Sequence, residues 1–194
     1  MAVVKKFRCV RPNERDAARV AALPYDVYSR SEAAQVVKDN PLSFLNIDRA
    51  ETQFPDDVDT YDDRVYEKAK ELLAERIADG TFIEDAESCY YIYELTMDGR
   101  SQAGIVAGSS VDDYLNGIVK KHENTREAKE RDRIRHVDTT DAQTGPIFLA
   151  YRSDQELNQL IGQAMAAAPL HDFTSQAGIR HRVWKLDDSG QTDQ

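Results

Sequence analysis

The sequence has few cysteines, no long apolar run and no excess of basic residues, and each absence excludes a class of protein. The two cysteines, Cys9 and Cys89, lie far apart and form no CxxC pair. This favours reduced thiols over a disulfide framework or a metal site. No segment approaches the roughly 18 apolar residues of a membrane span, and residues 1–13 turn polar too early for a signal peptide. We therefore expect a cytoplasmic protein with no membrane partner and no bound metal.

Basic residues are outnumbered by acidic residues. The chain has 25 Lys and Arg residues against 35 Asp and Glu residues, and its formal net charge is −10. A negative surface repels polyanions at long range, so the composition weighs against DNA binding. With 194 residues and 41% apolar content, the chain can form one core of ordinary size, or two small lobes that share one.

The hydrophobic pattern predicts an α+β fold, in one domain over residues 1–186 with a disordered tail at residues 187–194. Apolar residues recur at helical spacing over residues 61–77, so the longest helix should end before Gly80. Ser29 and Glu32 have the spacing of a capping box for a helix over residues 32–39. Pro12 suits the first turn of a helix over residues 12–22.

Strand-like segments are interspersed among these helices. The segments "SCYYIYEL" and "SQAGIVAGSS" flank "MDGR", whose Asp-Gly pair favours a tight hairpin turn. The word "IFLAY" at residues 147–151 predicts a short strand, and Ser153 with Glu156 predicts a capped helix after it. Residues 173–186 predict a second hairpin that turns near Gly178. We therefore expect a mixed sheet with a β-hairpin and flanking helices in a single compact unit.

The most unusual segment is "KKHENTREAKERDRIRH" at residues 120–136, which holds seven of the basic residues and two of the four histidines. Asn124 followed by Glu127 predicts the N-terminus of a helix over residues 125–137. Its apolar face is too small for a packed surface helix, because only three of its residues could be buried: Ala128, Ile134 and Val137. At about 100° per residue, a helix places four potential cations in one narrow stripe: Arg126, Lys129, Arg133 and His136.

Two interpretations of this stripe remain open. Charge-rich helices are usually solvated faces, and Glu130 could pair with Arg126 or Arg133. Alternatively, the stripe binds phosphate or carboxylate together with Lys121, because guanidinium and ammonium groups form charge-assisted hydrogen bonds to such oxygens.

The pair His122 and Glu123 precedes the stripe and supplies candidate catalytic groups. His122 can exchange a proton near neutral pH, and Glu123 can orient it or act as a base if partial burial raises its pKa. A lone histidine is more often structural, but His122 is flanked by lysine and glutamate and is not expected in an apolar core.

Several words of the sequence together resemble a known family: "LPYDV", "NPLSFLNIDR", "YDDRVYEKA", "YYIYEL", "SVDDYLNGIVKKHENTREAKERDRIRHV" and "TGPIF". Along nearly its full length the chain is similar to the uncharacterised prokaryotic domain-of-unknown-function family 1015, whose members often carry a ParB-like label. Members are typically about twice as long, so the resemblance implies an N-terminal part whose partner is a missing C-terminal lobe of the same protein. It also implies, by analogy, that Tyr25 and Asp26 lie near the stripe.

The second half of family members usually carries an "ADGHHR"-like motif, similar to the ParB and sulfiredoxin-like fold that also includes nucleotide-using free-serine kinases. This chain has no such motif.

Two function classes follow from the residues and the resemblance. The first is a small-molecule phosphotransferase resembling free-serine kinases, which takes a small phosphorylated or nucleotide ligand and has a nucleotide as the implied cofactor. The stripe would hold phosphate, and His122 or Glu123 would handle the proton of an acceptor hydroxyl. The second is a non-catalytic module, either a ParB-like nucleotide-dependent partner of DNA or a regulatory lobe. The net charge weighs against DNA.

Overall fold

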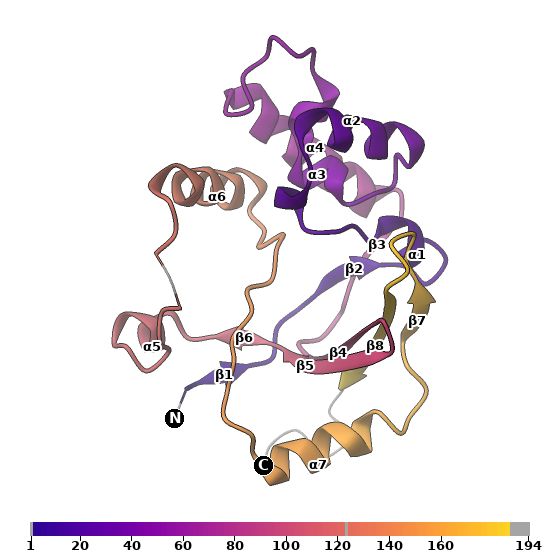
Figure 1. The fold of residues 1–194 in the computed structure, drawn as a ribbon, viewed down its shortest axis with the longest axis vertical. Helices are drawn as coiled ribbons and strands as arrows, with labels where there is room; N and C mark the ends of the chain where they lie inside the picture. The colour runs from indigo at the N-terminus through magenta and orange to yellow at the C-terminus, as the bar shows by residue number, and fades with distance from the viewer. Residues whose placement is uncertain (1, 123, 187–194) are drawn as a thin grey trace. The chain divides into compact units, whose positions relative to one another are not determined.

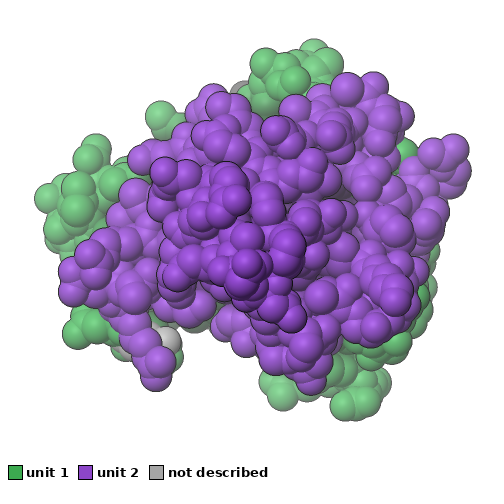
Figure 2. Space-filling view, turned by 90° about the horizontal axis from the view of Figure 1, so that it is seen from above, with its two compact units in different colours: residues 1–14, 84–124, 146–194 green, residues 15–83, 125–145 purple. Residues whose placement is uncertain are grey.

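The computed structural model describes residues 2–122 and 124–186, which Figure 1 shows as a ribbon. The chain divides into two compact units, coloured in Figure 2. Unit 1 comprises residues 1–14, 84–124 and 146–194, and unit 2 comprises residues 15–83 and 125–145. Most strands belong to unit 1 and most helices to unit 2, and the predicted α+β class is confirmed. The single domain expected over residues 1–186 stays a prediction, and the expected tail at residues 187–194 lies outside the described residues.

A four-stranded sheet forms the centre of unit 1, in the order β5-β4-β8-β7. The strands are β4 (Tyr90–Met97), β5 (Arg100–Val106), β7 (His171–Thr174) and β8 (Arg180–Leu186). All strand pairs of this sheet are antiparallel, whereas we expected a mixed sheet. Ile92 and Trp184 lie opposite each other in the β4–β8 register, and both are buried.

Both predicted hairpins are confirmed. Asp98 and Gly99 join β4 to β5 with φ angles of 51° and 77°, the left-handed conformation that a two-residue hairpin turn of this kind requires at both positions. Gly178, with φ of 76°, lies in the turn between β7 and β8.

The remaining elements of unit 1 are short. Strand β1 (Val4–Lys5) pairs with β6 (Gly108–Ser109), and unit 1 also contains β2 (Val10–Pro12), α5 (Val111–Leu115) and α7 (Gln155–Ala164). Strand β3 (Phe82–Glu84) is divided between the units.

Three expectations for unit 1 and its boundary were wrong. Pro12 ends β2 instead of opening a helix, and the only helix that follows before Pro24 is the short α1 (Ala17–Val20). Residues 147–151 form neither strand nor helix, because apolar side chains alone do not supply a backbone partner. The cap of α7 is Asp154, whose carboxylate accepts from the N–H of Leu157 at 2.9 Å, rather than Ser153.

A buried carboxylate, Asp85, joins three segments of unit 1. Arg11 donates to its two oxygens at 3.0 and 3.1 Å, Lys185 donates at 2.9 Å, and the hydroxyl of Tyr91 donates as well. Burial by itself would raise the pKa of Asp85, but the hydrogen bonds from these three side chains outweigh it and lower the pKa to about 2. The cluster therefore fixes Asp85 as a carboxylate.

Unit 2 is built from helices. They are α1, η1 (Tyr25–Val27), α2 (Arg30–Asp39), α3 (Leu45–Asp48), η2 (Ala50–Gln53), α4 (Asp63–Ala78) and α6 (Glu127–Thr140). The capping box of Ser29 and Glu32 is present at the start of α2. Helix α4 is the long helix that the spacing predicts, and Gly80 follows its end with φ of 79°.

The main core of unit 2 lies between α4 and the α3–η2 segment. Its buried members are Val20, Ile47, Ala50, Val65, Ala69, Leu72 and Phe82. Helix α6 contributes none of them. Its own buried residues are polar, namely Asp132, His136 and Thr140, and Ile134 is 55% exposed. Buried polar groups need hydrogen-bond partners, so the buried side chains of α6 require polar groups from other elements or from a ligand.

The predicted bounds of α6 were wrong at both ends. The helix begins at Glu127, its N-cap is Arg126, and no side chain bonds the cap, so the expected pair of Asn124 and Glu127 does not form. It continues to Thr140, whose hydroxyl donates to the carbonyl of His136 at 2.7 Å. Asp141 then ends the helix in the left-handed conformation, with φ of 52°.

Candidate functional site

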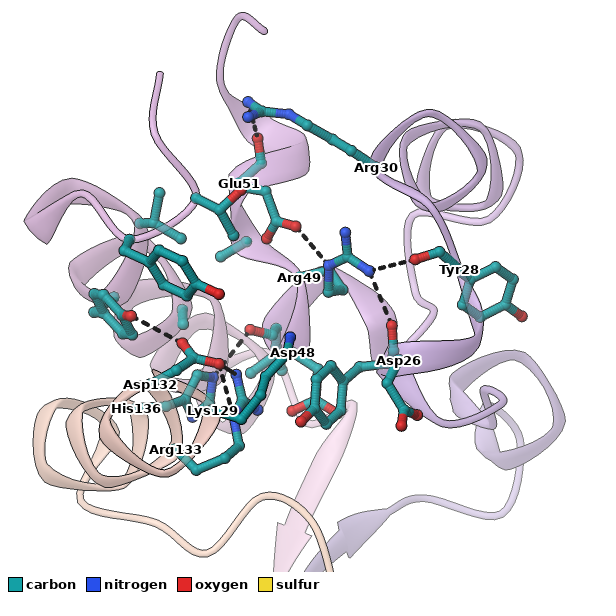
Figure 3. A pocket seen from close by; sticks show the side chains of 18 of the residues that line it. Asp26, Tyr28, Arg30, Asp48, Arg49, Glu51, Lys129, Asp132, Arg133 and His136 are labelled. Carbon is teal, nitrogen blue, oxygen red and sulfur yellow. Dashed lines mark hydrogen bonds and ion pairs between the residues drawn. The ribbon is translucent and has the colours of Figure 1, made fainter. Parts of the chain in front are cut away.

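A pocket of about 360 Å³ lies within unit 2 (Figure 3). Its walls come from η1, the start of α2, the α3–η2 segment, the loop before α4 with the first part of α4, and one face of α6. The volume is at the small end of the range for ligand pockets. Charged side chains of both signs line it, so its chemistry depends on which charges are already neutralised within the protein.

Helix α6 places four polar side chains on the pocket, from Lys129, Asp132, Arg133 and His136 (Figure 3). Arg133 donates to one oxygen of Asp132 from Nε at 3.2 Å and from Nη2 at 3.0 Å. The hydroxyl of Tyr66, on α4, donates to the other oxygen at 2.8 Å. Burial raises the pKa of Tyr66, and the hydrogen bond to Asp132 raises it further. Tyr66 therefore stays a donor, and Asp132 is held from two elements.

Two cations of α6 lie at one aromatic ring. The guanidinium carbon of Arg133 is 4.3 Å from the centroid of the Tyr25 ring, and Nζ of Lys129 is 5.7 Å from the same centroid. Both distances are within the range of cation–π interactions. Arg133 shares its charge with Asp132, whereas Lys129 forms no ion pair with any described residue. This wall therefore presents positive charge that the protein does not fully neutralise.

Arg49 supplies a third cation, in the segment between α3 and η2. Its Nη1 donates to the carbonyls of Tyr25 and Tyr28 at 2.9 and 2.8 Å, and its Nε donates to the buried carboxylate of Glu51 at 2.5 Å. Its Nη2 has no hydrogen-bond partner in the part of the chain that the structure describes. The guanidinium is therefore fixed in place with one donor group unused (Figure 3).

Arg30 also lines the pocket, but its donors are occupied. Its Nη1 donates to the carbonyl of Val58 at 2.7 Å and its Nη2 to that of Pro55 at 2.9 Å. Arg30 therefore holds the loop after η2 and contributes less to the chemistry of the pocket than Lys129 or Arg133.

The pocket also contains a neutral imidazole and a carboxyl group. His136 is 3% exposed, and its Nε2 lies 3.3 Å from the carbonyl of Ile47. Burial lowers the pKa of His136, and nearby Arg133 lowers it further. Burial raises the pKa of Asp48, although His136, Arg133 and a hydrogen bond from Thr144 at 3.1 Å oppose the rise. Both groups are thus suited to exchange protons with a ligand.

Five residues proposed from the sequence line this pocket: Tyr25, Asp26, Lys129, Arg133 and His136. Arg126 does not belong to the described lining, because it is the exposed N-cap of α6. Glu130 forms no ion pair with Arg126 or Arg133 among the described residues. The solvated face of α6 instead carries a pair between Glu127 and Arg131, whose side chains are 3.5 Å apart.

The other proposed residues belong to unit 1 by sequence. Nζ of Lys121 lies 5.1 Å from the ring of Tyr114, and His122 is exposed. Glu123 lies outside the described residues. The catalytic role of His122 and Glu123 stays a prediction.

Sequence reasoning missed Asp48, Arg49, Glu51, Tyr66 and Asp132. Asp132 was detectable, because it lies three residues after Lys129 and four before His136 on the same helical face. Arg49 had a weaker signal, because nothing in its neighbouring residues distinguishes it from a surface arginine.

In the described ranges, no three His, Cys, Asp or Glu residues are grouped so that they could hold a metal ion. No helix in those ranges is both long and apolar enough to cross a membrane.

Comparison with known proteins gives one match. The model of a family described as "Protein of unknown function (DUF1015)" matches residues 4–194. No curated protein and no solved structure matches the chain.

Proposed function

We propose that this chain, which belongs to the DUF1015 family of proteins of unknown function, binds a small phosphorylated or carboxylated compound in the unit 2 pocket. Lys129 and Arg133, which lie over the ring of Tyr25, would hold the anionic group, and Nη2 of Arg49 would supply a further donor.

The observation that carries this proposal is the placement of two like charges at one ring. Lys129 and Arg133 are four residues apart on α6, where like charges repel and destabilise a helix. Asp132 offsets only Arg133. A phosphate or carboxylate bound between the two cations would remove the repulsion and form charge-assisted hydrogen bonds with both.

The size of the pocket favours a small metabolite. A volume of about 360 Å³ suits a compound of a few carbon atoms with one phosphate or carboxylate group. The lining carboxylates Asp26, Asp48, Glu51 and Asp132 disfavour a polyanion.

A thermal-shift screen followed by calorimetry tests the proposal. The probes are inorganic phosphate, glycerol 1-phosphate, lactate and acetate, each compared with chloride at equal ionic strength. A ligand at a hundred times its dissociation constant stabilises the folded protein by about 2.7 kcal/mol. Lys129→Ala should weaken binding, whereas Arg131→Ala, on the solvated face of the same helix, should not. Absence of binding by every probe would refute the proposal.

Phosphoryl transfer is a second candidate, favoured by the two proton acceptors of the pocket. An acceptor hydroxyl in the pocket would form a bond to the terminal phosphorus of a nucleotide whose base, sugar and other phosphates stay outside the pocket. The bond between that phosphorus and the nucleotide's leaving oxygen would break in the same step. The hydroxyl proton would pass to His136 or Asp48.

Phosphorus NMR with ATP or ADP and small alcohols tests this second candidate. Comparison of His122→Gln with His136→Gln separates the catalytic residue proposed from the sequence from the histidine in the pocket. If wild-type protein forms no phosphorylated product, the phosphotransferase proposal is wrong, and the binding proposal is judged by calorimetry alone.

A further inference from the structure

His136 has a buried nitrogen that nothing in the described part of unit 2 satisfies. Its Nε2 lies against the carbonyl of Ile47, and since a carbonyl only accepts, Nε2 carries the hydrogen. Nδ1 of the neutral ring is then an acceptor. It is buried and has no hydrogen-bond partner among the described residues. Leaving such an atom unpaired is unfavourable, and native structures usually pair it with a protein group, a water molecule or a ligand.

Asp48 provides a second acceptor on the same pocket. Its Oδ1 accepts from the hydroxyl of Thr144 at 3.1 Å. Its Oδ2 accepts no hydrogen bond from the described residues. Asp48 is part-buried, and both it and His136 line the pocket. A carboxylate oxygen without a donor repels an anion, so these two acceptors do not serve the same ligand group as Lys129 and Arg133.

We infer that the ligand carries a hydroxyl or amino group besides its anionic group, and that His136 Nδ1 and Asp48 accept hydrogen bonds from it. The inference rests on the proposed function and specifies its ligand class: hydroxy- or amino-substituted small phosphates or carboxylates. The cations hold the anionic end, and the two acceptors select the donor end. This division explains why a pocket that presents two cations of α6 also keeps carboxylates.

Calorimetry with matched ligand pairs tests the inference on the full chain. Glycerol 1-phosphate and propyl phosphate share an anion and differ in hydroxyl groups, and lactate and propionate form the equivalent carboxylate pair. The two pairs also distinguish phosphate from carboxylate as the anionic group. The hydroxylated member of each pair should bind at least about tenfold more tightly than the member without the hydroxyl. This ratio corresponds to one hydrogen bond to a buried acceptor.

Two variants then locate the source of this preference. In His136→Gln, the amide nitrogen can still donate to the carbonyl of Ile47, but the ring acceptor is lost. Asp48→Asn retains the acceptor for Thr144 and removes the charge. Each variant should reduce the preference for the hydroxylated member of a pair to less than about threefold. His181→Gln is the matched control, since His181 is a histidine of unit 1 that is also buried with an unpaired nitrogen.

The outcomes are distinct. If both members of a pair bind equally to wild-type protein, the inference is wrong and the anion site stands, with Nδ1 satisfied by water. If a preference exists but persists in both Asp48→Asn and a folded His136→Gln, other residues select the hydroxyl and the inference is also wrong. If His136→Gln fails to fold, as judged by circular dichroism, Asp48→Asn decides. If no member binds, the proposed function and the inference fail together.

Discussion

Replacement of Arg133 by alanine separates a binding role for the α6 cations from a solubility role. In wild-type protein the Arg133 side chain bonds one oxygen of Asp132 through two nitrogens and lies against the Tyr25 ring. Arg131 is the matched control, since it has the same charge on the same helix and its side chain is 72% exposed. Of these two arginines, only Arg133 lines the pocket.

The contacts of Arg133 set the expected magnitudes. A charge-assisted hydrogen bond to a bound phosphate is worth about 1.5 to 3 kcal/mol, so Arg133→Ala should weaken ligand binding by roughly 10- to 150-fold. The variant also loses the contact with Asp132. The Arg133 side chain is 31% exposed and Tyr66 still donates to Asp132, so the free energy of unfolding should fall by only about 1 to 2 kcal/mol. Arg131→Ala should change the free energy of unfolding by less than about 1 kcal/mol.

The assay combines calorimetry with urea denaturation of both variants. Calorimetry uses the probe that binds wild-type protein most tightly, and denaturation gives the free energy of unfolding. If Arg133→Ala and Arg131→Ala bind the probe with equal dissociation constants, the pocket face of α6 does not bind the anion. A loss of stability in Arg133→Ala with unchanged affinity would make Arg133 a structural residue only.

Three further predictions concern stability. Tyr66→Phe removes the donor to buried Asp132 and should lower the free energy of unfolding by about 1 to 3 kcal/mol in urea denaturation; a loss below about 0.5 kcal/mol would mean that water replaces the hydroxyl. The pKa of Asp85 is lowered from 3.8 to about 2 on folding, so its stabilisation of about 2 kcal/mol is present above pH 3.8 and lost as the pH falls through about 2. The difference in stability between wild-type protein and Asp85→Asn should shrink in the same range, and a difference constant from pH 7 to pH 2 would contradict this. Gly99→Ala should destabilise the hairpin by about 1 kcal/mol because φ is 77°, whereas Gly104→Ala, with open space at its Cβ, should cost less; equal melting temperatures would refute the argument.

Elements with local signals were predicted from the sequence, because a few neighbouring residues determine them. The capping box at Ser29 needs only Glu32, three residues later. The turn at Asp98 and Gly99 needs only residues that tolerate positive φ. Helix α4 follows from apolar residues at helical spacing.

Elements that depend on distant partners were predicted poorly. Pro12 is compatible with a helix start, but the adjacent Arg11 bonds Asp85, which lies 74 residues away in the sequence. Residues 147–151 are as apolar as a strand, yet a strand also needs a neighbour for its backbone groups, and nothing local reveals whether one exists.

In the candidate site, too, local signals were predicted from the sequence and distant partners were not. Helical periodicity alone puts Lys129, Arg133 and His136 on one face, so this part of the site follows from the sequence. Only tertiary structure decided that this face is buried in part and what lies opposite it. The carbonyl of Ile47, which receives the hydrogen of His136, is 89 residues distant, and the Tyr66 hydroxyl that holds Asp132 is 66 residues distant. Local spacing determines which side chains of a helix point the same way, whereas packing of remote segments determines their partners and leaves one nitrogen of His136 unpaired among the described residues.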